Sequence, residues 1–271
     1  MPDKEKKEMS FLEHLEELRW HIIRSALAIG LFTTIAFFFR KFIFDDIILL
    51  PRNPDFITNR LLCELSRTLK MESLCINNQT IKLINITMGG QFNTHMRVSF
   101  IAGFIVAFPY IIYEIWKFIS PALKDHERRF SRGVILVTSL LFLTGVLFGY
   151  YVIIPFSIDF LSGYTVSNQI ENQINITSYI STVSSLVLAS GAIFELPIVV
   201  YFLSKIGLLT PKFMKKYRRH AIVVAVIVAA IITPPDVFSQ MLVAIPLYLL
   251  YEISIIISGR VLKQKEKIEI I

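Results

Sequence analysis

Cysteine is scarce in this sequence, and the residues of common catalytic sites are not grouped. Only two cysteines occur in 271 residues, and the five histidines are scattered along the chain. There is no Cys–His cluster, no G-x-S-x-G elbow, no phosphate-binding glycine loop and no metalloprotease helix motif. We therefore expect no metal, no cofactor and no enzymatic activity.

Charge is also low. Charged residues make up 18% of the chain and apolar residues 54%, and the mean hydropathy is +0.59. A soluble domain of this length usually carries more charge. Several apolar runs approach the ~20 residues needed to cross ~30 Å of hydrocarbon, and a backbone in lipid must satisfy its own hydrogen bonds. The sequence therefore predicts an all-α integral membrane protein.

A cleavable leader is the third feature that we do not find. The first apolar run, 22–39, is longer than the apolar region of a signal peptide and has no small-x-small site at its end. An Arg- and Ser-rich transit sequence is absent too. We expect a bacterial or archaeal protein that is inserted into the cytoplasmic membrane as it is made.

Six apolar runs divide the chain, and we expect each to cross the membrane as a helix. Lys and Arg are absent from 157–177 and 233–240 but occur in every other short segment between the runs. Positive charge marks the cytoplasmic side, so the alternation predicts that both termini are cytoplasmic. The basic residues then set topology and do not bind nucleic acid. The expected spans are roughly 22–39, 93–119, 133–156, 179–206, 221–232 and 241–257.

We expect a single domain over 1–271, with a membrane-surface segment at each turn. The run 221–232 is only about 18 Å long at ~1.5 Å per residue, so the last two spans should thin the bilayer locally. Gly145 and Gly149 have the spacing that lets two helices approach closely. The expected segments are a cytoplasmic helix at about 10–21, a periplasmic loop at about 40–92, cytoplasmic loops at about 120–132 and 207–220, and a cytoplasmic tail at 258–271.

An acidic helix start precedes the first apolar run. Ser10 and Glu13 have the spacing of a capping box, and apolar residues recur at helical spacing from Phe11 onward. Glu16 and Glu17 lie on other faces of the expected helix. Cytoplasmic membrane-surface segments are usually basic, so these carboxylates raise the question of a binding role. The residues taken alone favour the alternative, a capped and solvated helix start.

Glu195 is a carboxyl in the middle of an apolar run. Such a residue costs ~2.5–3.5 kcal/mol on insertion scales and is functional by default. Pro197 removes a backbone hydrogen bond and weakens the neighbouring turn. We expect Glu195 to act as a neutral acid toward a polar group on a visiting helix. The alternative is a protonated carboxyl that bonds to a neighbouring helix.

Cys63 and Cys75 both fall in the loop expected outside the cytoplasm, where disulfides form. Closing a loop of this size contributes ~3 kcal/mol in the chain-entropy model. Two free thiols and a disulfide both fit the sequence, and we predict the disulfide.

Four motifs occur in order along the chain. They are His14-Leu15-Glu16-Glu17-Leu18-Arg19, then Trp116 to Leu123 with His126-Glu127-Arg128-Arg129, then Phe194-Glu195-Leu196-Pro197, and last Thr233-Pro234-Pro235-Asp236 continuing to Gln240. Together they closely resemble the TatC family, the multispanning core of the twin-arginine protein translocase. The resemblance extends from about Ser10 to Ser258.

The resemblance implies six helices in a concave, glove-like bundle that receives signal peptides with paired arginines and helps to export folded proteins. Its two signal-peptide carboxylates would be Glu17 and Glu127, with Glu16, Arg19 and His126 beside them. A guanidinium binds a carboxylate through a planar fork that lysine cannot copy. Two carboxylates on two cytoplasmic segments therefore suit two adjacent arginines.

The resemblance also implies partners in the membrane. Single-span subunits of the TatA and TatB kind would pack near the last two spans, and the chain would self-associate in a larger complex within the lipid bilayer. Glu195, Pro197 and Gln240 would be intramembrane contacts, and Pro51, Pro121 and Asp236 would have structural or gating roles. This chain departs from the family in a longer loop around 54–82 and in Gly89-Gly90, where Ser-Pro is usual.

Two other classes of function remain to be weighed. An ion-coupled transporter of a small solute could use Glu195, but it would usually have internal repeats and more spans. An intramembrane enzyme would need a Ser/His pair, an Asp pair or a metal set within the spans, and only isolated carboxyls occur there. Both alternatives are weaker than the translocase.

Overall fold

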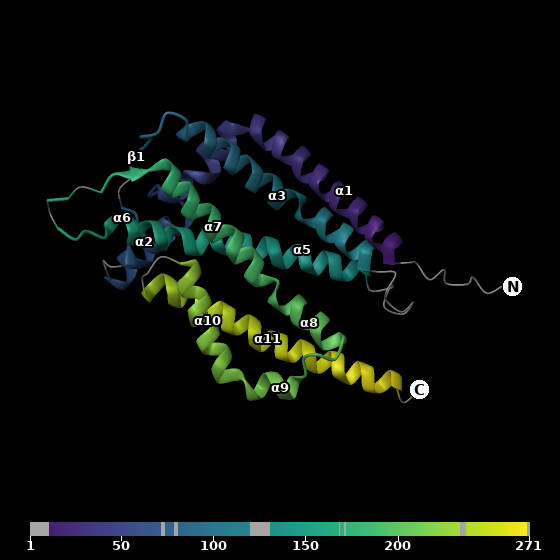
Figure 1. The fold of residues 1–271 in the computed structure, drawn as a ribbon. Coiled ribbons are helices and arrows are strands. Elements are labelled where there is room, and N and C mark those ends of the chain that lie inside the picture. The colour runs from purple at the N-terminus through teal and green to yellow at the C-terminus, as the bar shows by residue number, and fades with distance from the viewer. Residues whose placement is uncertain are drawn as a thin grey trace. The chain divides into compact units, whose positions relative to one another are not determined.

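The computed structural model describes residues 11–71, 74–78, 81–119, 131–167, 169–170, 172–233 and 237–269, and within these it leaves aside the side chains of 11–13, 131–132, 237–238 and 264–269. The described residues are mostly helical (Figure 1). They form two compact units, Met1–Phe39 with Met96–Ser139, and Arg40–His95 with Leu140–Ile271. Two of the three unit boundaries, 95/96 and 139/140, fall inside helices, and the expected single domain stays a prediction.

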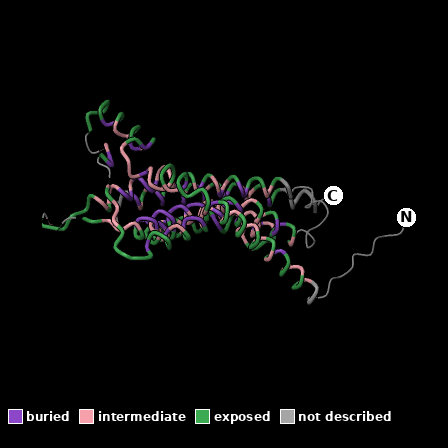
Figure 2. Tube along the Cα trace, turned by 90° about the horizontal axis from the view of Figure 1, so that it is seen from above, coloured by how far each residue is buried: buried purple, intermediate pink, exposed green. Residues whose placement is uncertain are grey.

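Within the described ranges, five helices are long and apolar enough to cross a membrane. They are His14–Phe38, Gly90–Ile119, Gly133–Gly163, Ile176–Lys205 and Ser239–Lys263. These helices confirm the expected helical fold with several candidate spans. Exposed residues recur along most of the helices (Figure 2), and many are large and apolar, such as Leu27, Leu31 and Phe38. Such surfaces suit contact with lipid.

The first unit contains α1 (Phe11–Phe38), most of α3 (Gly90–Ile119) and the start of α5 (Ser131–Phe148). α1 is one continuous helix, since no Gly or Pro separates the expected surface helix from the first span. α1 and α3 lie side by side (Figure 1). They approach closely at Gly103, where an added Cβ would lie 2.5 Å from the Thr33 backbone nitrogen.

The second unit contains the rest of the chain. After α5 come η5 (Gly149–Ile153), α6 (Ile154–Gly163), α7 (Ile176–Phe194) and α8 (Leu196–Lys205), and then α9 (Pro211–Lys216), α10 (Arg218–Ile232) and α11 (Val237–Glu269). α8 packs along α11, and α10 packs against α11 (Figure 1). α11 continues through the region expected to be a separate tail from 258, and α9 lies within the expected loop 207–220.

The expected close approach at Gly145 is confirmed. An added Cβ on Gly145 would lie 2.6 Å from the Ser190 carbonyl oxygen and 2.9 Å from the Gly191 Cα, so α5 and α7 touch through their backbones. The ring of Phe142 covers Gly191 on the same interface. Small residues therefore let these two apolar helices pack without a gap.

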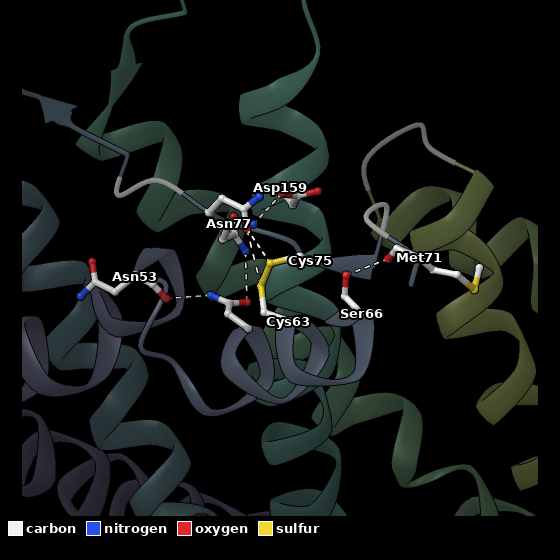
Figure 3. The surroundings of a disulfide bond; sticks show 9 residues. Asn53, Cys63, Ser66, Met71, Cys75, Asn77 and Asp159 are labelled. Atoms are coloured by element: carbon white, nitrogen blue, oxygen red, sulfur yellow. Dashed lines mark hydrogen bonds between the residues drawn. A yellow bond between two sulfur atoms is a disulfide. The ribbon is translucent and has the colours of Figure 1, made fainter. Parts of the chain in front are cut away.

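The segment between the first two candidate spans is structured rather than an open loop. It holds η1 (Phe42–Ile48), η2 (Leu50–Arg52), α2 (Ile57–Leu69) and β1 (Leu83–Ile84), which pairs in parallel with β2 (Ile174–Asn175). Cys63 of α2 and Cys75 form a disulfide (Figure 3). The segment packs on its own unit through Phe56, which is buried and stacks on Tyr151.

Two buried asparagines, Asn59 and Asn77, complete this packing, and Figure 3 shows Asn77 beside Asp159. Asn77 has a left-handed backbone with φ 51°, which Asn tolerates, and its N–H donates to Asp159 Oδ1 at 2.7 Å. Its Nδ2 donates to the Pro155 carbonyl at 2.9 Å. Asn59 Nδ2 donates to the carbonyl of Pro51 at 3.0 Å. Pro51 is buried at the start of η2, and the structural or gating role expected for it stays a prediction.

Candidate functional site

One face of α1 presents four polar side chains at intervals of three or four residues: His14, Glu17, His21 and Arg24. Residues at this spacing lie on one side of a helix. The His14 ring stacks on Phe118 near the end of α3, with centroids 4.5 Å apart. His21 Nδ1 lies 2.5 Å from Glu114 Oε2, one turn earlier on α3. This face of α1 therefore packs on the last two turns of α3.

Glu17 stands between these two contacts. Its side chain is half-buried, and Oε2 is buried without a hydrogen-bond partner among the described residues. A buried acceptor that is left unpaired costs ~1–3 kcal/mol, so the position favours an added donor. Glu16 and Arg19 are exposed. The neighbouring carboxylates of the motif are thus in different environments.

Glu114 is an ion-pair site that sequence reasoning missed. It is 2% exposed. Besides His21, the Arg24 Nη1 lies 3.9 Å from Oε2, and the Tyr110 hydroxyl also bonds to the carboxylate. Buried carboxylates are stable only when paired and hydrogen-bonded. The sequence showed Glu114 as an acidic residue inside an apolar run. It did not show the ion pair, because His21 and Arg24 belong to another helix, α1.

Glu127, His126, Pro121 and Asp236 lie outside the described residues. The expected pairing of Glu17 with Glu127 therefore stays a prediction, as do the roles of the other three.

Glu195 lies at a break between two helices. α7 ends at Phe194 and α8 begins at Leu196, with Glu195 as the residue between them. Pro197 is buried at the second position of α8, where its missing N–H costs little. The Glu195 side chain is partly exposed, and its buried Oε1 has no hydrogen-bond partner among the described residues. The sequence predicted a weakened turn, and the structure breaks the helix at a single residue, Glu195, whose backbone stays in the right-handed helical region with φ −78° and ψ −8°.

Gln240 joins the last two helices. Its Nε2 donates to the Val226 carbonyl of α10 at 3.2 Å, which gives this expected contact residue a bond within its own chain. A second link that the sequence did not reveal lies at the other end of α10. Arg218 Nη2 lies 2.6 Å from Glu252 Oε2, and the Tyr248 hydroxyl donates to Glu252 Oε1 at 2.8 Å.

Comparison with known proteins decides the family. The family model described as Sec-independent protein translocase protein (TatC) matches residues 13–246. The chain belongs to the TatC family.

Two bacterial relatives show how far the likeness to TatC extends. Sec-independent protein translocase protein TatC of Blattabacterium sp. subsp. Periplaneta americana is 44% identical over 263 residues, which cover 96% of this chain and 99% of that protein. The TatC protein of Aquifex aeolicus is 35% identical over 262 residues, which cover 96% of this chain and 99% of that protein. The expected place of this chain in Sec-independent protein translocation is confirmed.

Solved structures give the same answer for the TatC fold. Two crystal structures of a twin arginine translocase receptor, TatC, are 36% identical to this chain. One has a TM-score of 0.66 and covers 92% of this chain and 99% of its own. The other, determined in DDM, has a TM-score of 0.70 and covers 91% of this chain and 99% of its own. This member of the TatC family is therefore a helical multi-pass membrane protein.

Proposed function

We propose that this TatC protein is the receptor subunit that captures twin-arginine signal peptides on the cytoplasmic side of the membrane. The observation that carries the proposal is Glu17, whose half-buried carboxylate has an oxygen without a partner among the described residues. A guanidinium would supply the missing donors in a charge-assisted pair. The name of the solved relatives, twin arginine translocase receptor, supports the same role.

The geometry around Glu17 favours a fixed carboxylate. His14 is held by Phe118 and His21 by Glu114, so contacts on both sides of Glu17 keep this face of α1 against α3. A carboxylate on a rigid element loses little freedom when it binds. In the proposal Glu127, from the first basic loop, binds the second arginine of the signal peptide, and His126, Glu16 and Arg19 lie around the pair.

We further propose six spans with both termini in the cytoplasm, α10 being the short fifth span. α10 has 15 residues, or about 22 Å at ~1.5 Å per residue. It presents exposed apolar residues such as Val223, Ile227 and Ile231, and it begins with Arg218 and Arg219, which favour the cytoplasmic side. A bilayer thinned at this place would accommodate it.

In the same proposal, Glu195 and the α7–α8 break contact single-span subunits of the TatA and TatB kind. An unpaired carboxyl oxygen beside an interrupted helix offers polar contacts that an ordinary span lacks. TatC-family membership supports such partners, and transport of protein rather than catalysis is the role that follows.

Signal-peptide capture is tested by pull-down of a twin-arginine precursor with purified variants. Glu17→Ala and Glu127→Ala should each weaken binding by roughly tenfold, which corresponds to ~1.4 kcal/mol for one charge-assisted bond. Glu16→Ala is the matched comparison, because this adjacent carboxylate is exposed, and it should weaken binding less than Glu17→Ala does. Membrane insertion should be unchanged in all three.

The second part of the experiment changes the two arginines of the signal peptide to lysines. It should weaken binding to wild type far more than binding to the Glu17→Ala/Glu127→Ala variant, because the two changes remove one interaction. Normal retention of the precursor by the double variant would rule out the assignment.

A further inference from the structure

A cavity of about 380 Å³ opens in the second unit where helices begin and end at one boundary of the candidate spans. Arg40, Lys41 and Asp45 line it from the segment that follows α1, and Gln91 and His95 line it from the first turns of α3. Neither the family motifs nor the proposed signal-peptide site includes any of these residues.

The cavity carries opposite charges that the protein itself leaves unpaired. Arg40, Lys41 and Asp45 are all exposed, and among the described residues none of the three takes part in an ion pair. Lys41 and Asp45 are four residues apart, so both can face one small molecule. Two cations and one carboxylate match a ligand that carries an anionic group and a cationic group.

The α3 side of the cavity favours the anionic group. Gln91 lies in the first turn of a 30-residue helix, where N–H groups lack partners within the helix and the helix dipole is positive. The His95 ring is half-buried and stands edge-on to Phe44, with centroids 5.8 Å apart. This ring contact holds the His95 and Phe44 side chains together on one wall of the cavity.

The position of the cavity identifies the source of the ligand. Arg40 follows the candidate span His14–Phe38 by two residues, and Gln91 is the second residue of the span Gly90–Ile119. The cavity is therefore at the boundary between hydrocarbon and water, where lipid headgroups lie. Phe39, Phe42 and Phe92 are exposed around it, as expected for side chains that rest in the upper acyl region.

We propose that this cavity binds the phosphoethanolamine headgroup of a membrane lipid, with the phosphate at Arg40 and Lys41 and the ammonium at Asp45. Neither a headgroup that ends in glycerol nor a free phosphate would offer Asp45 a cation. The site needs only insertion in a bilayer, so it is independent of signal-peptide capture.

Native mass spectrometry of the purified full chain in mixed micelles tests the site. Wild type should retain phosphatidylethanolamine in preference to phosphatidylglycerol. Arg40→Gln/Lys41→Gln should lower retention of both lipids by roughly fivefold or more, because two exposed charge contacts are lost. Asp45→Asn should remove the preference for phosphatidylethanolamine and keep the binding of phosphatidylglycerol.

The matched control is Arg60→Gln/Arg67→Gln, which removes two exposed cations from α2 in the same segment, outside the cavity. It should retain lipid as wild type does. Equal loss in both double variants, or no preference between the lipids in wild type, would overturn the proposal. Soluble phosphoethanolamine should displace the lipid better than inorganic phosphate. Equal displacement by the two would make the cavity a plain anion site and would contradict a headgroup site.

Discussion

At the scale of single residues, buried polar groups carry the information that matters for function. Glu17 and Glu16 are adjacent and chemically identical, yet only Glu17 has a carboxyl oxygen buried without a partner among the described residues. That difference comes from which face of α1 packs on α3. Sequence spacing placed both residues on a helix, but it could not tell which one faces a helix about a hundred residues away.

The His21–Glu114 pair should stabilise the packing of α1 on α3. Glu114→Ala leaves a buried imidazole without its acceptor, and we expect a loss of ~1–3 kcal/mol. His21→Ala should cost a similar amount. The double variant should cost clearly less than the sum, because both changes remove the same contact. Thermal unfolding of the purified protein in detergent measures the series. Glu16→Gln, an exposed change on the same helix, should leave the midpoint unchanged, and strictly additive losses would show that the pair is not coupled.

Substitutions at Glu195 can show whether its carboxyl group acts as a hydrogen-bonding group or as a charge. Glu195→Gln keeps a donor and an acceptor, whereas Glu195→Ala keeps neither. We expect Gln to retain export and crosslinking to a TatA-type subunit. Ala should lose roughly tenfold in crosslinking, which equals ~1.4 kcal/mol of contact free energy, with precursor binding unchanged. Site-specific crosslinking with and without precursor gives the answer. If Gln and Ala fail alike, an ionised carboxylate is the working species.

At the scale of elements, apolar periodicity was enough to locate the long helices but not the structure between them. The run around 54–82 is polar on average, so the sequence predicted a loop there, although Ile57, Leu61, Leu65 and Leu69 recur at a four-residue spacing that is typical of a helix. Its helix α2 is held by Phe56, by the Cys63–Cys75 disulfide and by Asn59, and these contacts reach other parts of the unit. Local spacing could therefore have found α2 itself, whereas the stacking of Phe56 on Tyr151 joins residues far apart in the sequence and could not be found from local propensity.

The close contact of α5 with α7 was predictable because two glycines four residues apart, here Gly145 and Gly149, commonly let membrane helices approach closely. Gly145→Ala would push a Cβ to 2.6 Å from the Ser190 carbonyl oxygen, so we expect a loss of ~1–3 kcal/mol from overpacking. Gly133→Ala is the control on the same helix, since nothing lies within 4 Å of its added Cβ. It should be neutral or raise stability by ~0.5–1 kcal/mol. Thermal midpoints in detergent compare the two, and equal midpoints would contradict the close packing.

At the scale of the whole molecule, the number of membrane crossings depends on α10. In the part of the chain that the structure describes, five helices meet the length expected of a span, and the topology that we propose from charge alternation adds α10 as a sixth. Arg218, Glu252 and Tyr248 bind the first turn of α10 to α11, and Gln240 binds its far half. The two helices therefore form a hairpin, which would cross the membrane as a unit in the six-span topology.

The side on which Lys263 lies decides between five and six crossings. With a cytoplasmic N-terminus, six crossings return Lys263 to the cytoplasm, whereas five would leave it outside. In a Cys63→Ser/Cys75→Ser background, Lys263→Cys and Lys212→Cys should react with a membrane-impermeant maleimide only after the cells are permeabilised. Thr165→Cys, in the segment without Lys or Arg, should react in intact cells, and its exposed side chain makes it a suitable positive control. Labelling of Lys263→Cys in intact cells would place α10 at the membrane surface. It would also remove the argument for a thinned bilayer beside α10, because a helix of 15 residues requires thinning only if it crosses the membrane.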